Sequence, residues 1–210
     1  MKVTTLCIAA TFCSFAVSTS YGTGLLNGDF ESPVLSGLGA TYTSAPTDFA
    51  WQVGEGGQID HLRDYFQPSS GYQCVDLNGW AKGSIYQDFQ LSNTGFWQLS
   101  FDMAGNPDLP GIKTLRVEFG PAEGPWVNMG TFSFDSTGTS PYDLQWTTVD
   151  IPAFSALEGV NYRLQFISLN EGPCGPLLDN VRLALIPEPS VLALAIGAMA
   201  SRLVLMRRKS

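Results

Sequence analysis

Aromatic and acidic side chains stand together in segments of the sequence that are rich in glycine and proline. Trp51, Asp60, Tyr65 and Trp80 combine two residue types that recognise sugars. An exposed ring can stack on the apolar face of a sugar, and a carboxylate accepts hydrogen bonds from its hydroxyl groups. We therefore expect these four residues to bind a glycan, with packing in the core as the competing interpretation for each ring. Further candidates of the same types are Phe66, Trp126, Asp64 and Asp76.

Two acidic segments lie far apart in the chain and could still share a metal ion. NGDFE (27–31) opens the strand-rich region, and LLDN (177–180) begins its last strand. The first and last strands of a jelly roll can be neighbours, so Glu31 and Asp179 could offer Ca²⁺ the oxygen ligands that it prefers. The other open interpretation is that Asp29 and Asp179 only cap turns.

The usual catalytic patterns find little support in the sequence. His61 is the only histidine, and no G-x-S-x-G motif is present. The segment GEGG (54–57) lacks the lysine and the following helix of a phosphate-binding loop. Paired carboxylates for glycoside hydrolysis cannot be judged from sequence, because their separation is unknown. We expect a protein that is not an enzyme and a His61 that makes only local hydrogen bonds.

The four cysteines fall into two pairs. Cys7 and Cys13 lie in the N-terminal apolar run, while Cys74 and Cys174 lie in the body of the chain. In an exported protein, where oxidation is permitted, we expect a Cys74–Cys174 disulfide, with two separate buried thiols as the alternative.

The charge of the chain is strongly acidic. The formal net charge is −8, and six basic against eighteen acidic residues leave −12 between Gly22 and Leu185. Such a surface repels phosphate backbones, which argues against nucleic acid as a partner.

Alternating apolar residues predict that most of the chain is β-structure. In FWQLSFDMAG, four apolar side chains alternate with polar ones, as expected of a strand with one buried face. The same period recurs in 83–91, 113–120, 161–169 and 179–185, between turns rich in Gly, Pro, Asn and Asp. We find no convincing amphipathic helix there, so residues 23–185 are expected to form one all-β domain, an antiparallel two-sheet jelly-roll sandwich.

The N-terminus has the features of a secretory signal peptide. Lys2 is followed by an apolar run from Val3 to Val17 and then by the small residues Ser18 and Ser20. We expect residues 1–22 to be removed on export.

Several ordered segments resemble the choice-of-anchor C family of bacterial exported proteins. They are NGDFE, WQVGEGGQIDHLRDYFQ, VDLNGWAKGSIYQDF, LSFDMAGNPDLPGIKTLRV, FSFDSTG, QWTTVDIPAF and GPLLDNVRL. The same segments are similar to a domain family of unknown function in plant cell-wall proteins and to galactose-binding-like jelly rolls. These resemblances imply a β-sandwich associated with extracellular polysaccharide and a structural Ca²⁺ held by Glu31 and Asp179. Cys74 and Cys174 bring the chain closer to the plant version.

The C-terminus, residues 186–210, resembles the PEP-CTERM sorting signal of bacteria that make exopolysaccharide. Its motif is Pro187-Glu188-Pro189, followed by the apolar segment Val191 to Met206 and a basic tail of Arg207, Arg208 and Lys209. The resemblance implies recognition by an exosortase-type membrane peptidase. Sixteen residues of helix span about 24 Å, which is short for a bilayer core of about 30 Å, so we expect a transient membrane helix. The basic tail would face the cytoplasm.

Together these features predict a non-catalytic exported protein that binds or is embedded in extracellular polysaccharide. It would be held briefly at the inner membrane, with its domain outside the cytoplasm, before reaching the cell surface or matrix. The alternative is a structural envelope or matrix protein without a sugar site.

Overall fold

A computed structural model describes residues 24–186 of the chain. The expected signal peptide (1–22) and the expected sorting segments (187–189, 191–206 and 207–209) lie outside the described residues. Within 24–186, no helix is long and apolar enough to cross a membrane.

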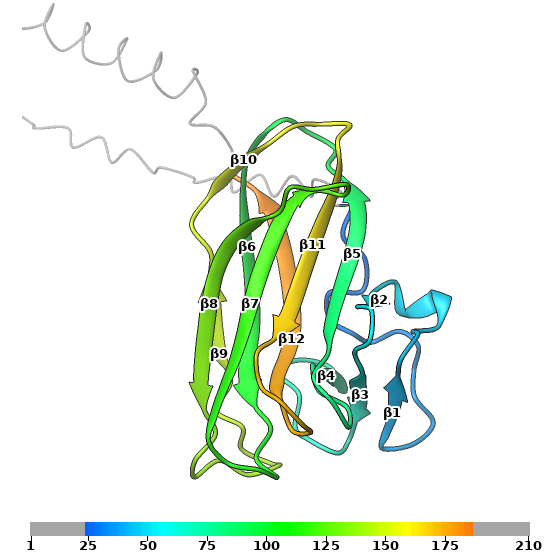
Figure 1. The fold of residues 1–210 in the computed structure, drawn as a ribbon, viewed down its shortest axis with the longest axis vertical. Helices are drawn as coiled ribbons and strands as arrows, with labels where there is room; N and C mark the ends of the chain where they lie inside the picture. The colour runs from blue at the N-terminus through cyan, green and yellow to red at the C-terminus, as the bar shows by residue number, and fades with distance from the viewer. Residues whose placement is uncertain (1–23, 187–210) are drawn as a thin grey trace, which may run out of the picture.

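Two antiparallel sheets pack face to face, as Figure 1 shows, and confirm the predicted jelly-roll sandwich. The seven-stranded sheet has the order β1-β3-β4-β12-β6-β10, with β9 also paired to β6. Its strands are β1 (Gly39–Tyr42), β3 (Ile59–Arg63), β4 (Gln73–Asp76), β6 (Gly95–Gly105), β9 (Thr147–Asp150), β10 (Phe154–Ala156) and β12 (Pro176–Leu185). The five-stranded sheet has the order β2-β5-β11-β7-β8. Its strands are β2 (Gln52–Val53), β5 (Ser84–Gln90), β7 (Ile112–Pro121), β8 (Val127–Asp135) and β11 (Asn161–Ser168). A 3₁₀ turn, η1 (Thr47–Phe49), precedes β2.

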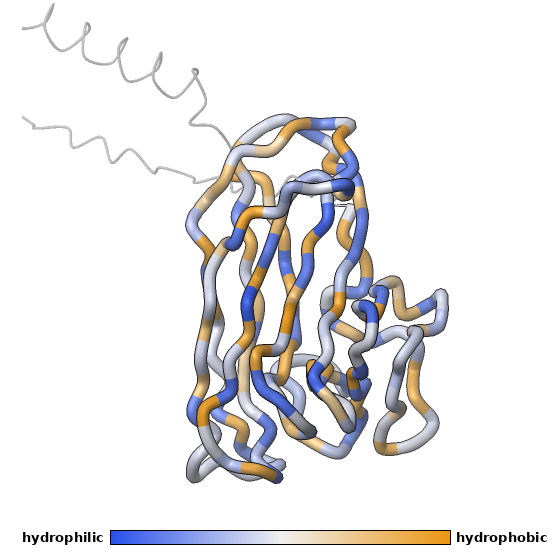
Figure 2. The backbone as a smooth tube through the Cα atoms, viewed as in Figure 1, coloured by the Kyte–Doolittle hydropathy of each residue, from blue (hydrophilic) through white to orange (hydrophobic). Residues whose placement is uncertain are grey.

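The strands form where alternation places apolar side chains on one face. Figure 2 shows hydrophobic and hydrophilic residues alternating along β5, β7 and β11. In β11, Tyr162, Leu164 and Phe166 are buried while the residues between them are not. The two sheets bury these faces against each other, and Phe101 and Phe166 meet edge to face with their centroids 5.1 Å apart. This shared core holds the two sheets together.

A second, smaller apolar cluster lies apart from the main core. Phe66, Cys74, Ala104, Leu144 and Leu177 form it. All four residues of β4 are buried, which places this strand between the main core and the small cluster. Loops therefore cover the outer side of the seven-stranded sheet around β4.

The start of the described chain lies against its last strand, as the jelly-roll prediction requires. The backbone N–H of Val181 in β12 donates to the Gly28 carbonyl at 2.7 Å. A Cβ at Gly28 would lie 2.1 Å from the Val181 carbonyl oxygen, so the close approach requires glycine there.

The expected Cys74–Cys174 disulfide is wrong, because both thiols are free. Leu178 pairs with Val75 across β12 and β4, so the position opposite Cys74 is Asp179. Cys174 precedes that position by five residues, or about 16 Å of extended chain, whereas a disulfide needs Cα atoms within about 7 Å.

Candidate functional site

Strand β3 has one side in the core and the other in a surface pocket. Ile59 and His61 are fully buried against the core, so the alternate residues Asp60 and Leu62 face outward. There they line a pocket of about 370 Å³, a size that suits a small ligand. Residues of β1 and the loops that follow β3, β4, β6 and β11 complete its wall.

Two exposed aromatic rings line the pocket. Trp80, in the loop between β4 and β5, is 79% exposed, and Tyr65, just after β3, is 43% exposed. The backbone N–H of Trp80 donates to Gln58 Oε1 at 3.2 Å. The Tyr65 ring packs edge to face on Phe66, with centroids 4.7 Å apart. The loops are therefore fixed at their bases while the Trp80 ring stays open to solvent.

Two carboxylates, Asp60 and Asp108, supply hydrogen-bond acceptors in the pocket. Thr41 Oγ1 donates to Asp60 Oδ1 at 2.6 Å, and the Tyr65 hydroxyl donates to Asp108 Oδ2 at 2.9 Å. Partial burial raises the pKa of Asp60, and the hydrogen bond to Asp108 raises the pKa of Tyr65. Both carboxylates keep further lone pairs that can accept from a ligand.

A third carboxyl lies behind the pocket rather than in it. Asp76 pairs with Asp60 across β3 and β4 and is 1% exposed. It accepts hydrogen bonds from Asn106 Nδ2 at 2.7 Å and from the backbone N–H of Asn78 at 2.8 Å and Gly175 at 3.0 Å. Burial raises its pKa to about 7. Asp76 thus ties together the loops that form the wall and does not contact solvent.

Three of the four residues predicted to bind a glycan line this pocket, and the fourth does not. Trp51 is fully buried, packs on Phe30 and Phe166, and donates its indole N–H to the Asn27 carbonyl at 2.9 Å. A ring enclosed in this way cannot stack on a ligand, so the prediction for Trp51 is wrong. It is a core residue.

The further candidates divide in the same manner. Phe66 is buried at the edge of the pocket, and Asp64 pairs with Arg63 at 3.4 Å outside it. Trp126 lies in the loop between β7 and β8 of the other sheet, 5.3 Å from the guanidinium of Arg163. Neither Asp64 nor Trp126 belongs to the pocket.

His61 faces the core. Its Nε2 atom lies 2.7 Å from the Phe30 carbonyl, and its ring centroid is 5.0 Å from that of Phe49. Burial lowers its pKa. A neutral imidazole enclosed among aromatic rings has no access to a substrate in the pocket.

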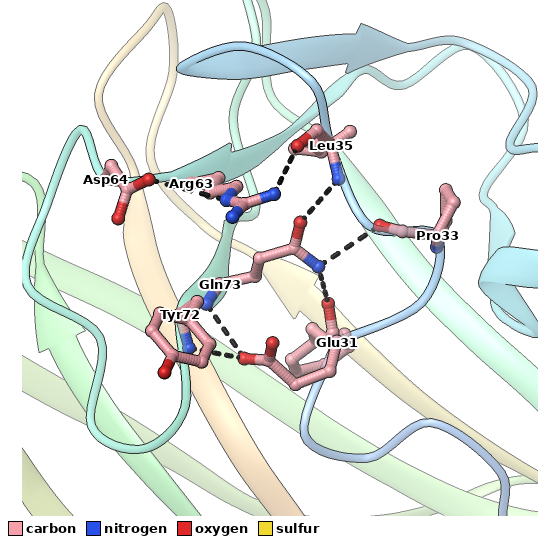
Figure 3. Close-up of polar contacts among 8 residues, drawn as sticks. Glu31, Pro33, Leu35, Arg63, Asp64, Tyr72 and Gln73 are labelled. Atoms are coloured by element: carbon pink, nitrogen blue, oxygen red, sulfur yellow. Dashed lines mark hydrogen bonds and ion pairs between the residues drawn. The ribbon is translucent and has the colours of Figure 1, made fainter.

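Glu31 anchors the turn that precedes β4. Its Oε1 atom accepts from the backbone N–H of Tyr72 at 2.6 Å and of Gln73 at 2.9 Å, as Figure 3 shows. Gln73 in turn donates to the carbonyls of Phe30 and Pro33 and accepts from the Leu35 N–H. Gly71 in this turn has φ +63, and a Cβ there would lie 2.2 Å from Glu31 Oε1. The opening segment is therefore fastened to the turn through Glu31 and Gln73.

Asp179 reaches the same turn from β12. Its Oδ2 atom accepts from the Ser70 N–H at 3.0 Å, whereas its Oδ1 atom is buried without a hydrogen-bond partner. Burial raises the pKa of Asp179 to about 7. A buried carboxylate with an orphaned oxygen fits a cation ligand, because a hard cation would satisfy that oxygen.

Glu31 and Asp179 both bind the turn before β4, yet they are only two potential metal-ligating side chains. No group of three or more acidic, histidine or cysteine side chains within 24–186 is arranged to hold a metal ion. A Ca²⁺ here would have to draw further oxygens from backbone carbonyls or water.

Other pocket residues had no sequence signal that set them apart. Asn106 and Asp108 belong to GNPDLPG, which reads as a turn, and Cys174 reads as half of a disulfide. The structure shows instead that Asn106 links Asp76 to the pocket wall and that Asp108 holds Tyr65. Only the pairing of distant loops reveals these roles.

The fold and this site define an antiparallel β-sandwich with a pocket of exposed rings and carboxylates on the outer side of one sheet. The sequence profile of the family described as "Protein of unknown function (DUF642)" matches residues 23–184. The chain belongs to this family, in agreement with the resemblance to a domain of unknown function. The resemblances to choice-of-anchor C proteins and to a PEP-CTERM signal stay predictions. No significant match was found among curated proteins.

Solved structures share the sandwich at low sequence identity. The K2 cleaved adhesin domain of Lys-gingipain is 15% identical with a TM-score of 0.50, and the match covers 75% of this chain and 96% of that one. TmCBM61 in complex with beta-1,4-galactotriose is 16% identical with a TM-score of 0.47, covering 79% and 99%. A family 35 carbohydrate-binding module from Clostridium thermocellum is 14% identical with a TM-score of 0.47, covering 70% and 99%. The first of these supports the fold, and none assigns a ligand.

Proposed function

We propose that this protein is a non-catalytic carbohydrate-binding β-sandwich that holds a polysaccharide in the pocket beside β3. The observation that carries the proposal is that the exposed Trp80 ring lines one pocket with Asp60, Tyr65 and Asp108. A large apolar ring that is 79% exposed is unfavourably hydrated in the unbound protein. Such a ring can stack on the apolar face of a sugar, while the neighbouring acceptors can bind its hydroxyl groups.

A glycan array tests this proposal when probed with the wild type and two variants. Trp80→Ala removes the stacking surface, whereas Trp126→Ala is a matched control on the opposite sheet. We expect binding by the wild type and the control and loss of binding by Trp80→Ala, with unchanged melting temperature for Trp80→Ala. Silence of the wild type across the array would contradict a sugar site and favour the structural envelope or matrix protein. Equal loss in both variants would contradict this pocket as the site.

The proposal includes export and sorting, which rest on the sequence segments outside residues 24–186. A signal peptide in 1–22 would direct export, and an exosortase-type peptidase would recognise Pro187-Glu188-Pro189. Mass spectrometry of the protein from cells and medium would report both mature termini. Loss of residues near 1–22 and of the basic tail is the expected result. A dominant full-length C-terminus would instead indicate a lasting anchor.

The proposal also includes a structural Ca²⁺ beside Glu31 and Asp179. It is supported by the partnerless Oδ1 of Asp179 and by the shared turn that both residues hold. Bound there, the cation would keep Asp179 ionised and fasten the opening segment to β12. Its role would be structural, because this turn is separate from the pocket lining.

A further inference from the structure

The charged groups that line the pocket are all acidic. Asp60 and Asp108 both belong to the lining. No lysine, arginine or histidine is among the lining residues in the described part of the chain. A ligand in this pocket therefore meets a negative potential on the side of β3 and on the side of the loop after β6.

Three basic residues near the pocket lining, Arg63, Lys82 and Lys113, are already engaged. Arg63 follows Leu62 in β3 and donates from Nη1 to the Leu35 carbonyl at 2.6 Å. Lys113 is 6% exposed, and its Nζ donates to the Cys174 carbonyl at 2.6 Å. Lys82 is paired with Glu171. All three side chains already have partners and none belongs to the pocket lining, so a uronic acid would enter the pocket without a cationic partner and against two carboxylates.

Trp80 also favours a cationic ligand in the pocket. The face of an indole ring attracts cations through its quadrupole, and this face is exposed beside the carboxylates. An ammonium group brings three donors and no acceptor, which matches the carboxylate oxygens of Asp60 and Asp108.

We propose that the pocket selects glycans that carry a protonated amine, such as glucosamine polymers, over N-acetylated, neutral and uronic acid glycans. This inference rests on the proposed sugar-binding function and names its ligand class. The ring faces of the sugar would stack on Trp80, and the ammonium group would donate to Asp60 and Asp108.

Titration calorimetry of the full chain tests the selectivity with four probes at mildly acidic pH, where the glucosamine amine is charged. The probes are oligomers of glucosamine, N-acetylglucosamine and galacturonate, and a lysine-rich peptide of similar length. We expect the glucosamine oligomer to bind about tenfold more tightly than its acetylated form, because its hydrogen bonds are charge-assisted. Galacturonate and the peptide should bind more weakly still.

Two variants and a control assign the effect to the pocket. Asp60→Asn and Asp108→Asn should each remove most of the preference for the free amine. Asp108 is exposed, so this variant keeps the test valid if Asp60→Asn is poorly folded. Glu158→Gln removes an acid near Thr94, at the other end of β6, and should leave the preference unchanged.

The outcomes separate the two proposals. If the acetylated and free oligomers bind equally and Trp80→Ala weakens both, the sugar site stands and the amine selectivity is wrong. If the lysine-rich peptide binds as tightly as glucosamine, charge alone governs the pocket and the selectivity for a glycan is wrong. Absence of binding by any glycan would overturn both.

Discussion

The core between the two sheets and the outer side of the seven-stranded sheet use the same residue types for opposite purposes. In the core, just before β2 of the five-stranded sheet, Trp51 is fully buried and its indole N–H donates to a backbone carbonyl. On the outer side, Trp80 is 79% exposed, so its ring is open to solvent. The difference teaches that an aromatic residue in a turn-rich segment does not reveal its role by itself, because the packing of distant segments decides whether the ring is buried or exposed.

Trp51→Ala should have the largest effect of any change in this comparison. Removal of the indole leaves a cavity between Phe30 and Phe166. We expect a loss of about 3–5 kcal/mol in the free energy of unfolding, measured by urea denaturation. A loss below about 1 kcal/mol would show that the ring is not a core residue.

Asp179→Asn should have the second-largest effect, because it removes a buried carboxylate whose ionisation lowers the stability of the folded protein. Because the folded pKa is about 7 and the ordinary value is 3.8, the folded state binds the proton more tightly, and wild-type stability falls as pH rises between these values. In chelator above pH 7, the variant should therefore be more stable than the wild type, by about 2–4 kcal/mol. The two should converge below pH 4.

Added Ca²⁺ should reverse that order. A cation on the Asp179 carboxylate would stabilise the wild type and leave Asp179→Asn unchanged. The melting temperatures of both proteins, measured in chelator and in excess Ca²⁺, test this expectation. An identical wild-type melting temperature in the two buffers would contradict the Ca²⁺ proposal while leaving the pH prediction in place.

Trp80→Ala should change stability far less than Trp51→Ala. An exposed ring contributes little packing, so we expect the free energy of unfolding to stay within about 0.5 kcal/mol of the wild type. The same urea titration measures it. A loss comparable to that of Trp51→Ala would mean that Trp80 is structural and that the core and the outer side do not differ as described.

A reductant should have no effect on the folded protein. Cys74 lies in the small apolar cluster and Cys174 in the pocket wall, with no bond between them. Alkylation after unfolding without reduction, followed by peptide mapping, should label both residues. Recovery of a linked Cys74–Cys174 peptide would contradict the strand register of β4 and β12.

Much of the fold could be predicted from sequence because burial on one face imposes a period of two. Leu99 and Phe101 in β6, and Leu164 and Phe166 in β11, lie in the core as their spacing predicts. The short strands β1 and β2 gave no such period, since four and two residues are too few to establish one.

The site could be predicted only in part. Rings and acids in turn-rich segments suit sugar recognition, which predicts Asp60, Tyr65 and Trp80, and all three line the pocket. The burial of Trp51 is not predictable in this way, because its partners come from distant segments. The cysteine pairing and the roles of Asn106 and Asp108 depend on register and loop packing, which residue types do not encode.

Oxidative footprinting of the tryptophans tests the central claim most directly. In the free protein, Trp80 and Trp126 should be modified, while the fully buried Trp51 and Trp97 should be protected. Addition of the glycan with the strongest array signal should protect Trp80 and leave Trp126 unchanged. Protection of Trp126 without protection of Trp80 would place the sugar on the other sheet and contradict the account.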